Sequence, residues 1–256
     1  VEAALEEFGA GALLVETISN PLLRVADLEA LARLCRTRNA ALIVDNTFAT
    51  PLLVRPLELG AHLVVHSSTK YLGGHGDTLG GLVVSDEGHF ETVRRFSRVA
   101  GPVMGPMEAY LTMRGIKTFP LRMERQCQNA AALAAWLRRH PRVERVFSLD
   151  DPAHPDAAVI RRLLPEGLRG GMVSFEIRGA RREQIFAFLD RLKLCVRATS
   201  LGDVHTMVLY PWIASHRDVP LEQKASMGLR ENLVRFSVGI EAVEDVIADI
   251  AQALEP

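Results

Sequence analysis

Four short apolar runs, each ending in turn-forming or chemically capable residues, constrain the fold of this chain most strongly. They are GALLVETI, AALIVDN, HLVVHSS and GGLVVS, at residues 11–18, 40–46, 62–68 and 80–85. Strands that are apolar at nearly every position are typical of a parallel or mixed sheet that helices cover on both faces. Between the first two runs, Asp27 is placed to cap a helix over DLEALARLCRTRN. The first half is therefore predicted to be α/β, with its sheet buried on both faces.

Three of these runs end in polar residues that can take part in chemistry. The three ends are Glu16–Asn20, Asp45–Thr47 and Ser67–Lys70. In open α/β sheets, ligands bind outside the carboxyl ends of the strands. We therefore expect these three strand ends to converge on one crevice.

The second half of the chain predicts a smaller α+β domain. A long helical stretch near residues 121–139 is placed to link the two halves, and helices are expected at REQIFAFLDRL and VEDVIADIAQAL. The predicted domains are 1–120, part of a large α/β domain, and 121–256, the linking helix with the α+β domain. Shorter strands are expected at residues 143–148, 171–177, 194–198, 205–210 and 233–239.

Composition excludes several classes of function. The 256 residues carry 30 basic and 31 acidic side chains, a net charge of −1, so no overall charge favours nucleic acid or an anionic membrane. No apolar run approaches the roughly 18 residues of a membrane helix. The clustered Arg94, Arg95 and Arg98 are interpreted as a solvated helix face.

The cysteines indicate a reducing compartment. Cys35, Cys127 and Cys195 are scattered, without the spacing of a disulfide framework or a zinc site, so no metal site is predicted. The first residues, VEAALEEFGAGALLVE, are acidic and amphipathic and do not have the pattern of a signal peptide. We expect a cytoplasmic protein.

Lys70 is the candidate reactive residue, because it follows a predicted buried strand and precedes a glycine-rich turn, in HSSTKYLGGHGD. A lysine can form a Schiff base with an aldehyde, Asp45 can keep a ring nitrogen protonated, and Ser67 and Thr69 carry hydroxyls suited to phosphate. Asn20 adds an amide. Together these groups describe a site for pyridoxal 5′-phosphate. Spacing alone leaves open a surface lysine beside an ordinary glycine turn, and the turn lacks the GK[ST] ending of a phosphate-binding P-loop.

Five segments resemble one family across nearly the whole chain. The five segments are VETISNP, IVDNTFATP, RPLELGAHLVVHSSTKYLGGHGD, ATSLGD and NLVRFSVGIE. They closely resemble the cysteine/methionine-metabolism group of pyridoxal-phosphate enzymes. That group includes cystathionine γ-synthase, cystathionine β- and γ-lyases, methionine γ-lyase and O-acetylhomoserine sulfhydrylase. The resemblance implies the aminotransferase-like type I fold, with a large α/β domain and a small C-terminal α+β domain.

The resemblance also implies roles for the cofactor residues. Lys70 matches the lysine that holds the cofactor and later moves protons, and Asp45 matches the partner of the pyridine nitrogen. Ser67 and Thr69 match hydroxyls on the phosphate side, and Asn20 matches the amide beside the phenolic oxygen.

Two further positions match the substrate side of the family's site. Arg235 matches the arginine that binds the substrate α-carboxylate, a task suited to its planar fork, and Ser200 matches a residue that lines the same site. A structural pair between Arg235 and Glu231 or Glu241 is the alternative. Thr47, His75 and His216 fall within or near these motifs without an assigned role.

Two departures from the family pattern affect these expectations. The family's chains are longer at the N-terminus, where they carry a phosphate cradle, a tyrosine stacked on the cofactor and a Tyr/Arg pair that reaches the neighbouring subunit. We therefore expect a longer natural polypeptide that forms a homodimer or homotetramer with shared active sites. YPWIASHR, at 210–217, only partly follows the family's P-A-x-x-T-H pattern, which leaves the substrate open.

The reaction is predicted to be γ-elimination from a sulfur amino acid of the methionine or cystathionine type. Cystathionine-handling relatives often carry a glutamate before the residue that Ser200 matches, and this chain has Thr199 there. The alternatives are γ-replacement, as in O-acylhomoserine sulfhydrylase or cystathionine γ-synthase, and an inactive or regulatory cofactor-binding homologue. The core motifs serve all of these reactions.

Overall fold

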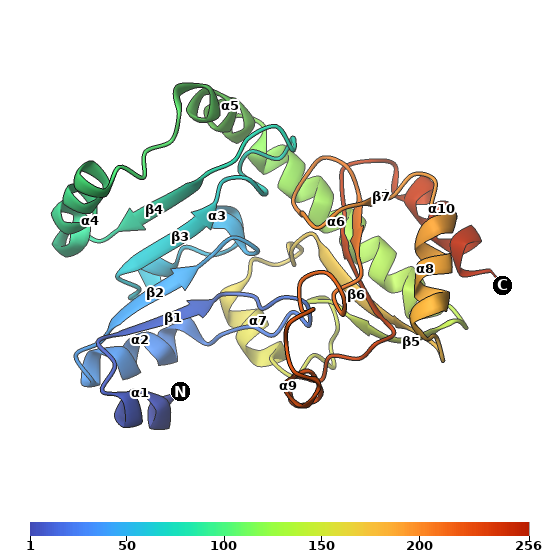
Figure 1. Ribbon diagram of the computed structural model, residues 1–256, viewed down its shortest axis with the longest axis horizontal. Coiled ribbons are helices and arrows are strands. Elements are labelled where there is room, and N and C mark those ends of the chain that lie inside the picture. The colour runs from blue at the N-terminus through green and yellow to red at the C-terminus, as the bar shows by residue number, and fades with distance from the viewer. Residues whose placement is uncertain (256) are drawn as a thin grey trace.

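The computed structural model describes residues 1–255, which form two β-sheets connected by a long helix (Figure 1). The first half contains α1 (Glu2–Phe8), β1 (Ala12–Glu16), α2 (Leu28–Thr37), β2 (Ala41–Asp45), α3 (Thr50–Leu53), η1 (Pro56–Leu59), β3 (Leu63–Ser67), β4 (Gly81–Ser85), α4 (Glu87–Ala100) and α5 (Pro106–Ile116). The second half contains α6 (Phe119–Leu137), β5 (Val143–Phe147), α7 (Ala157–Leu163), β6 (Met172–Ile177), α8 (Arg182–Arg191), β7 (Val196–Arg197), β8 (Met207–Leu209), α9 (Leu221–Met227), β9 (Leu233–Ser237) and α10 (Val243–Leu254).

The first sheet has the strand order β1-β2-β3-β4. Strands β1, β2 and β3 run parallel, and β4 pairs antiparallel to β3. Glu16 lies in register with Asp45, and Asp45 in register with Val65. The carboxyl ends of β1, β2 and β3 therefore meet at one edge of the sheet, as predicted.

Helix α2 shows how local sequence determines this half of the fold. The Asp27 carboxylate accepts a hydrogen bond from the backbone N–H of Ala30 at 3.1 Å, which confirms the predicted N-cap. Leu28, Ala32 and Cys35 repeat at helical spacing and are all buried. They pack in the same hydrophobic cluster as the inward-facing side chains of β2.

The prediction that the sheet is buried on both faces is wrong for the described residues. Leu42, Val44 and Val64 on one face are fully or nearly fully buried, whereas Leu14 and Val83 on the other face are 68% and 52% exposed. Within residues 1–255, the apolar character of the strands therefore overstates their burial. Because side chains alternate along a strand, Asp45 and Ser67 belong to the open face.

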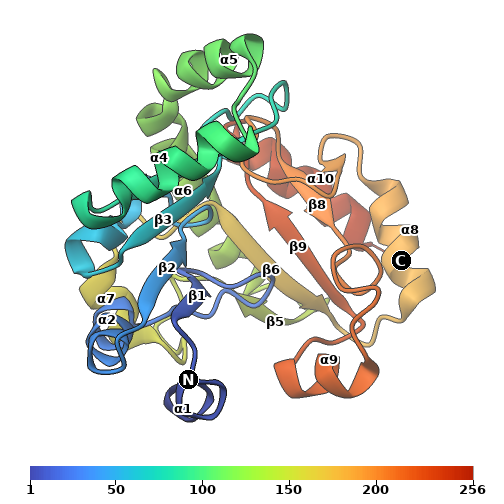
Figure 2. The same cartoon turned by 60° about the vertical axis from the view of Figure 1, so that its left-hand side comes forward.

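The second sheet has the strand order β5-β6-β9-β8-β7 (Figure 2). All of its pairs are antiparallel except β7 with β8. Helices α6, α8 and α10 contribute to the hydrophobic cluster on this sheet, in which Phe175, Phe188 and Phe236 are buried in mutual aromatic contact. The strands and helices expected in this half are present, although β7 is only two residues long.

Helix α6 runs from the first sheet to the second (Figure 1). Its residues Phe119 and Met123 pack in the first hydrophobic cluster, and Leu133 and Leu137 pack in the second. Helix α7 also packs in the first cluster, although it follows the linking helix. The division into 1–120 and 121–256 stays a proposal, with its boundary in the first turn of α6.

Helix α4 carries the predicted solvated arginine face, since Arg94, Arg95 and Arg98 are all exposed. None of the described helices combines the length and apolar character needed to cross a membrane.

Candidate active site

Lys70 lies in the turn that follows the carboxyl end of β3. Its backbone N–H donates to Ser67 O at 3.2 Å, and its carbonyl accepts from Gly74 N at 2.8 Å. The ammonium nitrogen Nζ donates to Ser200 Oγ at 3.0 Å. Burial lowers the pKa of Lys70, and the nearby Arg235 charge lowers it further. Among residues 1–255 no carboxylate forms an ion pair with this lysine, so no acidic partner opposes the lowering of its pKa.

Arg235, on β9, is a buried cation without an acidic partner in the described chain. Its side chain is 2% exposed, and burial lowers its pKa to about 10. Nη1 donates to Asn20 Oδ1 at 2.8 Å, and Nη2 donates to Ser200 O at 3.1 Å. The alternative of an Arg–Glu pair is wrong for Glu241, whose carboxylate instead accepts from the Thr206 hydroxyl at 2.9 Å. Burial of an unpaired guanidinium is unfavourable, and it is typical of a site that binds an anion.

Asp45 and Thr47 join the ends of β2 and β3. The Asp45 carboxylate accepts from the backbone N–H of Thr47 at 2.9 Å. The Thr47 hydroxyl in turn accepts from the backbone N–H of Ser67 at 2.9 Å. Thr47 therefore orients the strand ends that carry Asp45 and Ser67. Sequence reasoning left Thr47 without a role, and its place in the DNTF motif was the available signal.

The Thr69 hydroxyl makes backbone contacts that the sequence did not indicate. Its hydroxyl accepts from Gly80 N at 3.0 Å and lies 3.3 Å from Gly80 O, so it closes the loop between β3 and β4. Its predicted role on the phosphate side, like that of Ser67, stays a prediction.

Asn20 lies between the first strand end and the second sheet. Because its Oδ1 accepts from Arg235, its NH₂ group is turned away from that contact and can donate elsewhere. A donor is what a phenolic or phenolate oxygen requires. The predicted role of Asn20 is therefore compatible with its contact to Arg235.

The glycines after Lys70 allow another element to approach closely. Gly74 has φ +70°, and a Cβ there would lie 1.9 Å from Arg122 Nη1. Arg122, on α6, donates to Tyr71 O at 2.9 Å and to Leu72 O at 3.3 Å. Sequence reasoning missed Arg122, although its position on the same helix face as Phe119 and Met123 indicates burial. This buried arginine holds the Lys70 loop against the linking helix.

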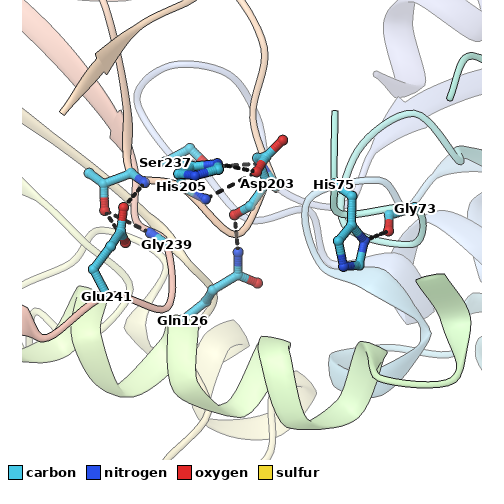
Figure 3. Close-up of polar contacts among 10 residues, drawn as sticks. Gly73, His75, Gln126, Asp203, His205, Ser237, Gly239 and Glu241 are labelled. Carbon is cyan, nitrogen blue, oxygen red and sulfur yellow. Dashed lines mark hydrogen bonds and ion pairs between the residues drawn. The ribbon is translucent and has the colours of Figure 1, made fainter. Parts of the chain in front are cut away.

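The motif residues beyond this loop form local contacts that Figure 3 shows. His75 is exposed, and its Nδ1 lies 2.7 Å from Gly73 O, inside its own turn. Gln126 of α6 donates to the backbone oxygen of Asp203 at 2.7 Å, which fixes the segment after Ser200. Ser237 Oγ accepts from Gly202 N at 2.8 Å in the same segment. The ATSLGD stretch is thus held from both α6 and β9.

His216 is buried in the partly divergent stretch 210–217. Its Nδ1 lies 2.8 Å from Ser215 Oγ, and burial followed by the Lys224 and Arg235 charges lowers its pKa. Thr199 is exposed next to Ser200. Both residues lie on the side of the site where Arg235 is found, and neither supplies a negative charge.

Comparison with known proteins identifies the family. Residues 1–255 match the profile described as Cys/Met metabolism PLP-dependent enzyme. The chain belongs to this family. Its cofactor is therefore pyridoxal phosphate, and the family resemblance expected from the motifs is confirmed.

Similar proteins in the family have several names. An L-methionine gamma-lyase of Fusobacterium nucleatum subsp. polymorphum is 43% identical over 94% of this chain and 61% of its own length. A cystathionine gamma-lyase of Bacillus subtilis is 43% identical over 95% of this chain and 64% of its own length. A chloroplastic cystathionine gamma-synthase 1 of Arabidopsis thaliana is 42% identical over the full chain and 45% of its own length. This family member thus spans about six-tenths or less of the length of these relatives.

The fold of this family member is the type I pyridoxal-phosphate fold. A cystathionine gamma-lyase (CalE6) of Micromonospora echinospora superposes with a TM-score of 0.93 at 39% identity, over 98% of this chain and 66% of that one. A cystathionine gamma-synthase of Xanthomonas oryzae pv. oryzae, solved in complex with cystathionine, gives 0.93 at 36% identity, over 99% and 65%. The predicted fold class is confirmed.

Proposed function

We propose that this chain carries the active-site residues of a carbon–sulfur γ-lyase that acts on a sulfur amino acid and releases a thiol, a 2-oxo acid and ammonia. The observation that carries the proposal is the meeting of Lys70 and Arg235 at Ser200. Lys70 Nζ contacts its hydroxyl and Arg235 Nη2 contacts its carbonyl. An α-amino acid carries a carboxylate, which a guanidinium binds, on the same carbon as the proton that an amine base removes.

The residues present fit pyridoxal phosphate. Lys70 would hold its aldehyde carbon, Asp45 its ring nitrogen and Asn20 its phenolic oxygen, while Ser67 and Thr69 would face its phosphate. The fit rests on an amine with a lowered pKa and on a carboxylate at the open edge of the sheet. When bound, the cofactor supplies an electron sink for negative charge that develops at the substrate α-carbon.

The side chains of this chain perform the remaining tasks. Arg235 holds the substrate carboxylate, bidentately and largely away from water, and so fixes the orientation of the α-carbon. Lys70 Nζ, whose pKa is lowered by burial and by the Arg235 charge, takes the α-proton and later returns a proton. Ser200 Oγ directs that nitrogen toward the carboxylate site.

A second candidate is γ-replacement, in which a thiol or sulfide adds where the leaving group departs from Cγ. Its support is the presence of a cystathionine gamma-synthase and an O-succinylhomoserine sulfhydrylase among the relatives. The uncharged Thr199 beside Ser200 favours a methionine-type or O-acetylhomoserine-type substrate over cystathionine, because no carboxylate at that position attracts a distal amino group.

A substrate panel separates these candidates. The holoenzyme is assayed with methionine, with cystathionine, and with O-acetylhomoserine plus sulfide, and the products 2-oxobutyrate and homocysteine are quantified. The γ-lyase proposal predicts 2-oxobutyrate from methionine or cystathionine alone. Faster product formation with O-acetylhomoserine plus sulfide supports replacement, and full cofactor loading without any turnover supports a regulatory homologue.

Thr199→Glu provides a matched variant for the choice of substrate. An added carboxylate favours the distal amino group of cystathionine. The ratio of kcat/KM for cystathionine to kcat/KM for methionine should therefore rise by about tenfold. Exposed Thr37→Glu adds the same charge on α2 and should leave the ratio unchanged. An unchanged ratio in Thr199→Glu would remove position 199 from the pocket.

We also propose a homodimer or homotetramer with shared active sites. Support comes from apolar side chains exposed along α4, α5 and the segment between them, including Phe96, Val103, Met107 and Met113, at 63% to 72% exposure. Light scattering of the natural polypeptide should give two or four times its monomer mass. A stable monomer would contradict the proposal.

A cytoplasmic location is proposed from the three cysteines, which are all free and buried. Cell fractionation with antibody detection tests it, and recovery from a secreted fraction would contradict it.

A further inference from the structure

Arg235 and Tyr71 each carry a buried polar atom for which residues 1–255 provide no hydrogen-bond partner of good geometry. The atoms are Nε of Arg235 and the phenolic oxygen Oη of Tyr71. Tyr71 directly follows Lys70 and is 1% exposed. Buried polar groups nearly always find a partner, so these two atoms call for an explanation.

Tyr71 is held in place by the close approach of two glycines. A Cβ on Gly202 would lie 2.5 Å from the Tyr71 backbone nitrogen, and a Cβ on Gly171 would lie 3.0 Å from its Oη. The ring therefore has little freedom to move away from β6 and β9. Burial raises the pKa of Tyr71 well above its usual range, so the phenol stays protonated.

Two groups on β9 face this phenol. Arg235 and Ser237 are two residues apart on one strand and therefore project to the same side. Ser237 Oγ already accepts from Gly202 N, which leaves its own proton to donate toward Tyr71 (Ser237 is labelled in Figure 3). The Ser237 hydroxyl and the Arg235 charge both oppose the rise in the pKa of Tyr71, as expected of neighbours of its oxygen.

We propose that Tyr71 is a positioning residue for Arg235, with its Oη accepting from Arg235 Nε directly or across one water. The inference rests on the proposed function, in which Arg235 binds the substrate carboxylate. Nη1 and Nη2 are oriented by Asn20 and Ser200, and Nε is the remaining donor to be fixed.

A neutral acceptor is chemically suited to this position. A carboxylate there would pair with the guanidinium and weaken its attraction for substrate, whereas a phenol orients Nε and leaves the charge in place. Because Tyr71 directly follows Lys70 in the chain, one short segment then positions both the amine that would hold the cofactor and the guanidinium that would bind the carboxylate.

The test compares two probes that differ only in the carboxylate. The holoenzyme of the complete natural chain is titrated with L-alanine and with ethylamine, and the absorbance shift of the bound cofactor is followed. The variant is Tyr71→Phe, which keeps the ring. The matched control is Tyr210→Phe, because Tyr210 is also buried and its hydroxyl also has no partner among the described residues. Tyr210 differs in its surroundings: it belongs to the second hydrophobic cluster and packs edge-to-face against Phe186.

Tyr71→Phe should bind L-alanine about tenfold more weakly, as expected for loss of a hydrogen bond to a charged group, with ethylamine unchanged. Tyr210→Phe should change neither. Unchanged L-alanine binding in Tyr71→Phe, or equal weakening of both probes, would overturn the inference while leaving the proposed function intact. A wild-type holoenzyme that binds both probes equally would contradict carboxylate recognition by Arg235, and with it both proposals.

Discussion

Lys70 Nζ donates a hydrogen bond to Ser200 Oγ at 3.0 Å, across 130 residues of sequence. The backbone oxygen of the same serine accepts from Arg235 Nη2 at 3.1 Å. Ser200 therefore sets the spacing between the proposed cofactor lysine and the proposed carboxylate-binding arginine. Because Arg235 is a like charge, it also lowers the pKa of Lys70.

Asp45→Asn should retain the cofactor and lose most turnover, because a neutral amide cannot keep the pyridine nitrogen protonated. Electrostatic groups of this kind contribute on the order of 3 kcal/mol, so kcat should fall by about a hundredfold. Steady-state kinetics at matched cofactor loading measures the effect. Asp77→Asn, at an exposed position in the Lys70 loop, is the control, and near-normal turnover in Asp45→Asn would refute the assigned role.

Arg235→Ala should weaken amino-acid substrates by about a hundredfold or more and leave the absorbance spectrum of the bound cofactor unchanged. Arg235→Lys should also bind poorly, because an ammonium cannot form the bidentate contact. Arg95→Ala, on the exposed face of α4, serves as the control. Loss of cofactor in place of substrate affinity would mean that Arg235 is misassigned.

The reactivity of Lys70 should depend on pH in a manner set by its neighbours. In the cofactor-free protein, burial and the Arg235 charge lower the pKa of Lys70. Competitive acylation across a pH series, followed by peptide mass spectrometry, measures the midpoint at which Lys70 becomes reactive. In Arg235→Ala this midpoint should rise, because the like charge is removed, whereas Arg235→Lys should largely preserve it. An unchanged midpoint in Arg235→Ala would contradict this account.

Gly74→Ala should destabilise the cofactor-free protein by about 2 kcal/mol or more, because the added methyl group meets the buried Arg122 guanidinium and φ is positive. Gly9→Ala is the matched control, since its φ is +53° but no atom lies within 4 Å of the added Cβ. It should lose about 1 kcal/mol from backbone strain alone. Urea denaturation measures the free energy of unfolding of both variants. Equal losses of stability would mean that the Arg122 side chain moves aside without an energetic penalty.

Local signals in the sequence were sufficient to predict the helices and strands and the polar residues at the strand ends. The Asp27 cap, the α2 periodicity and the polar residues that follow β1, β2 and β3 each act over a few residues, so a single sequence reveals them. Motif resemblance then selected Lys70, Asp45 and Arg235. The roles implied for these residues stay predictions until the variants are measured.

Long-range contacts could not be predicted in this way. Asn20 contacts Arg235 across 215 residues, and Arg122 reaches Tyr71 across 51, pairings that only the packing of α6 and β9 creates. The burial of β1 was also overestimated, because an apolar strand does not reveal whether a covering layer lies within the same segment. Leu14 is as apolar as Leu42, yet their exposures are 68% and 0%.

The most direct test of the central claim is reduction of the holoenzyme with borohydride, followed by proteolysis and peptide mass spectrometry. The account predicts a stable pyridoxyl adduct on the peptide that contains Lys70, and no adduct in Lys70→Ala. The chain has three other lysines, Lys117, Lys193 and Lys224, which serve as internal controls. A pyridoxyl group on any of these three, with Lys70 unmodified, would contradict the assignment of the site.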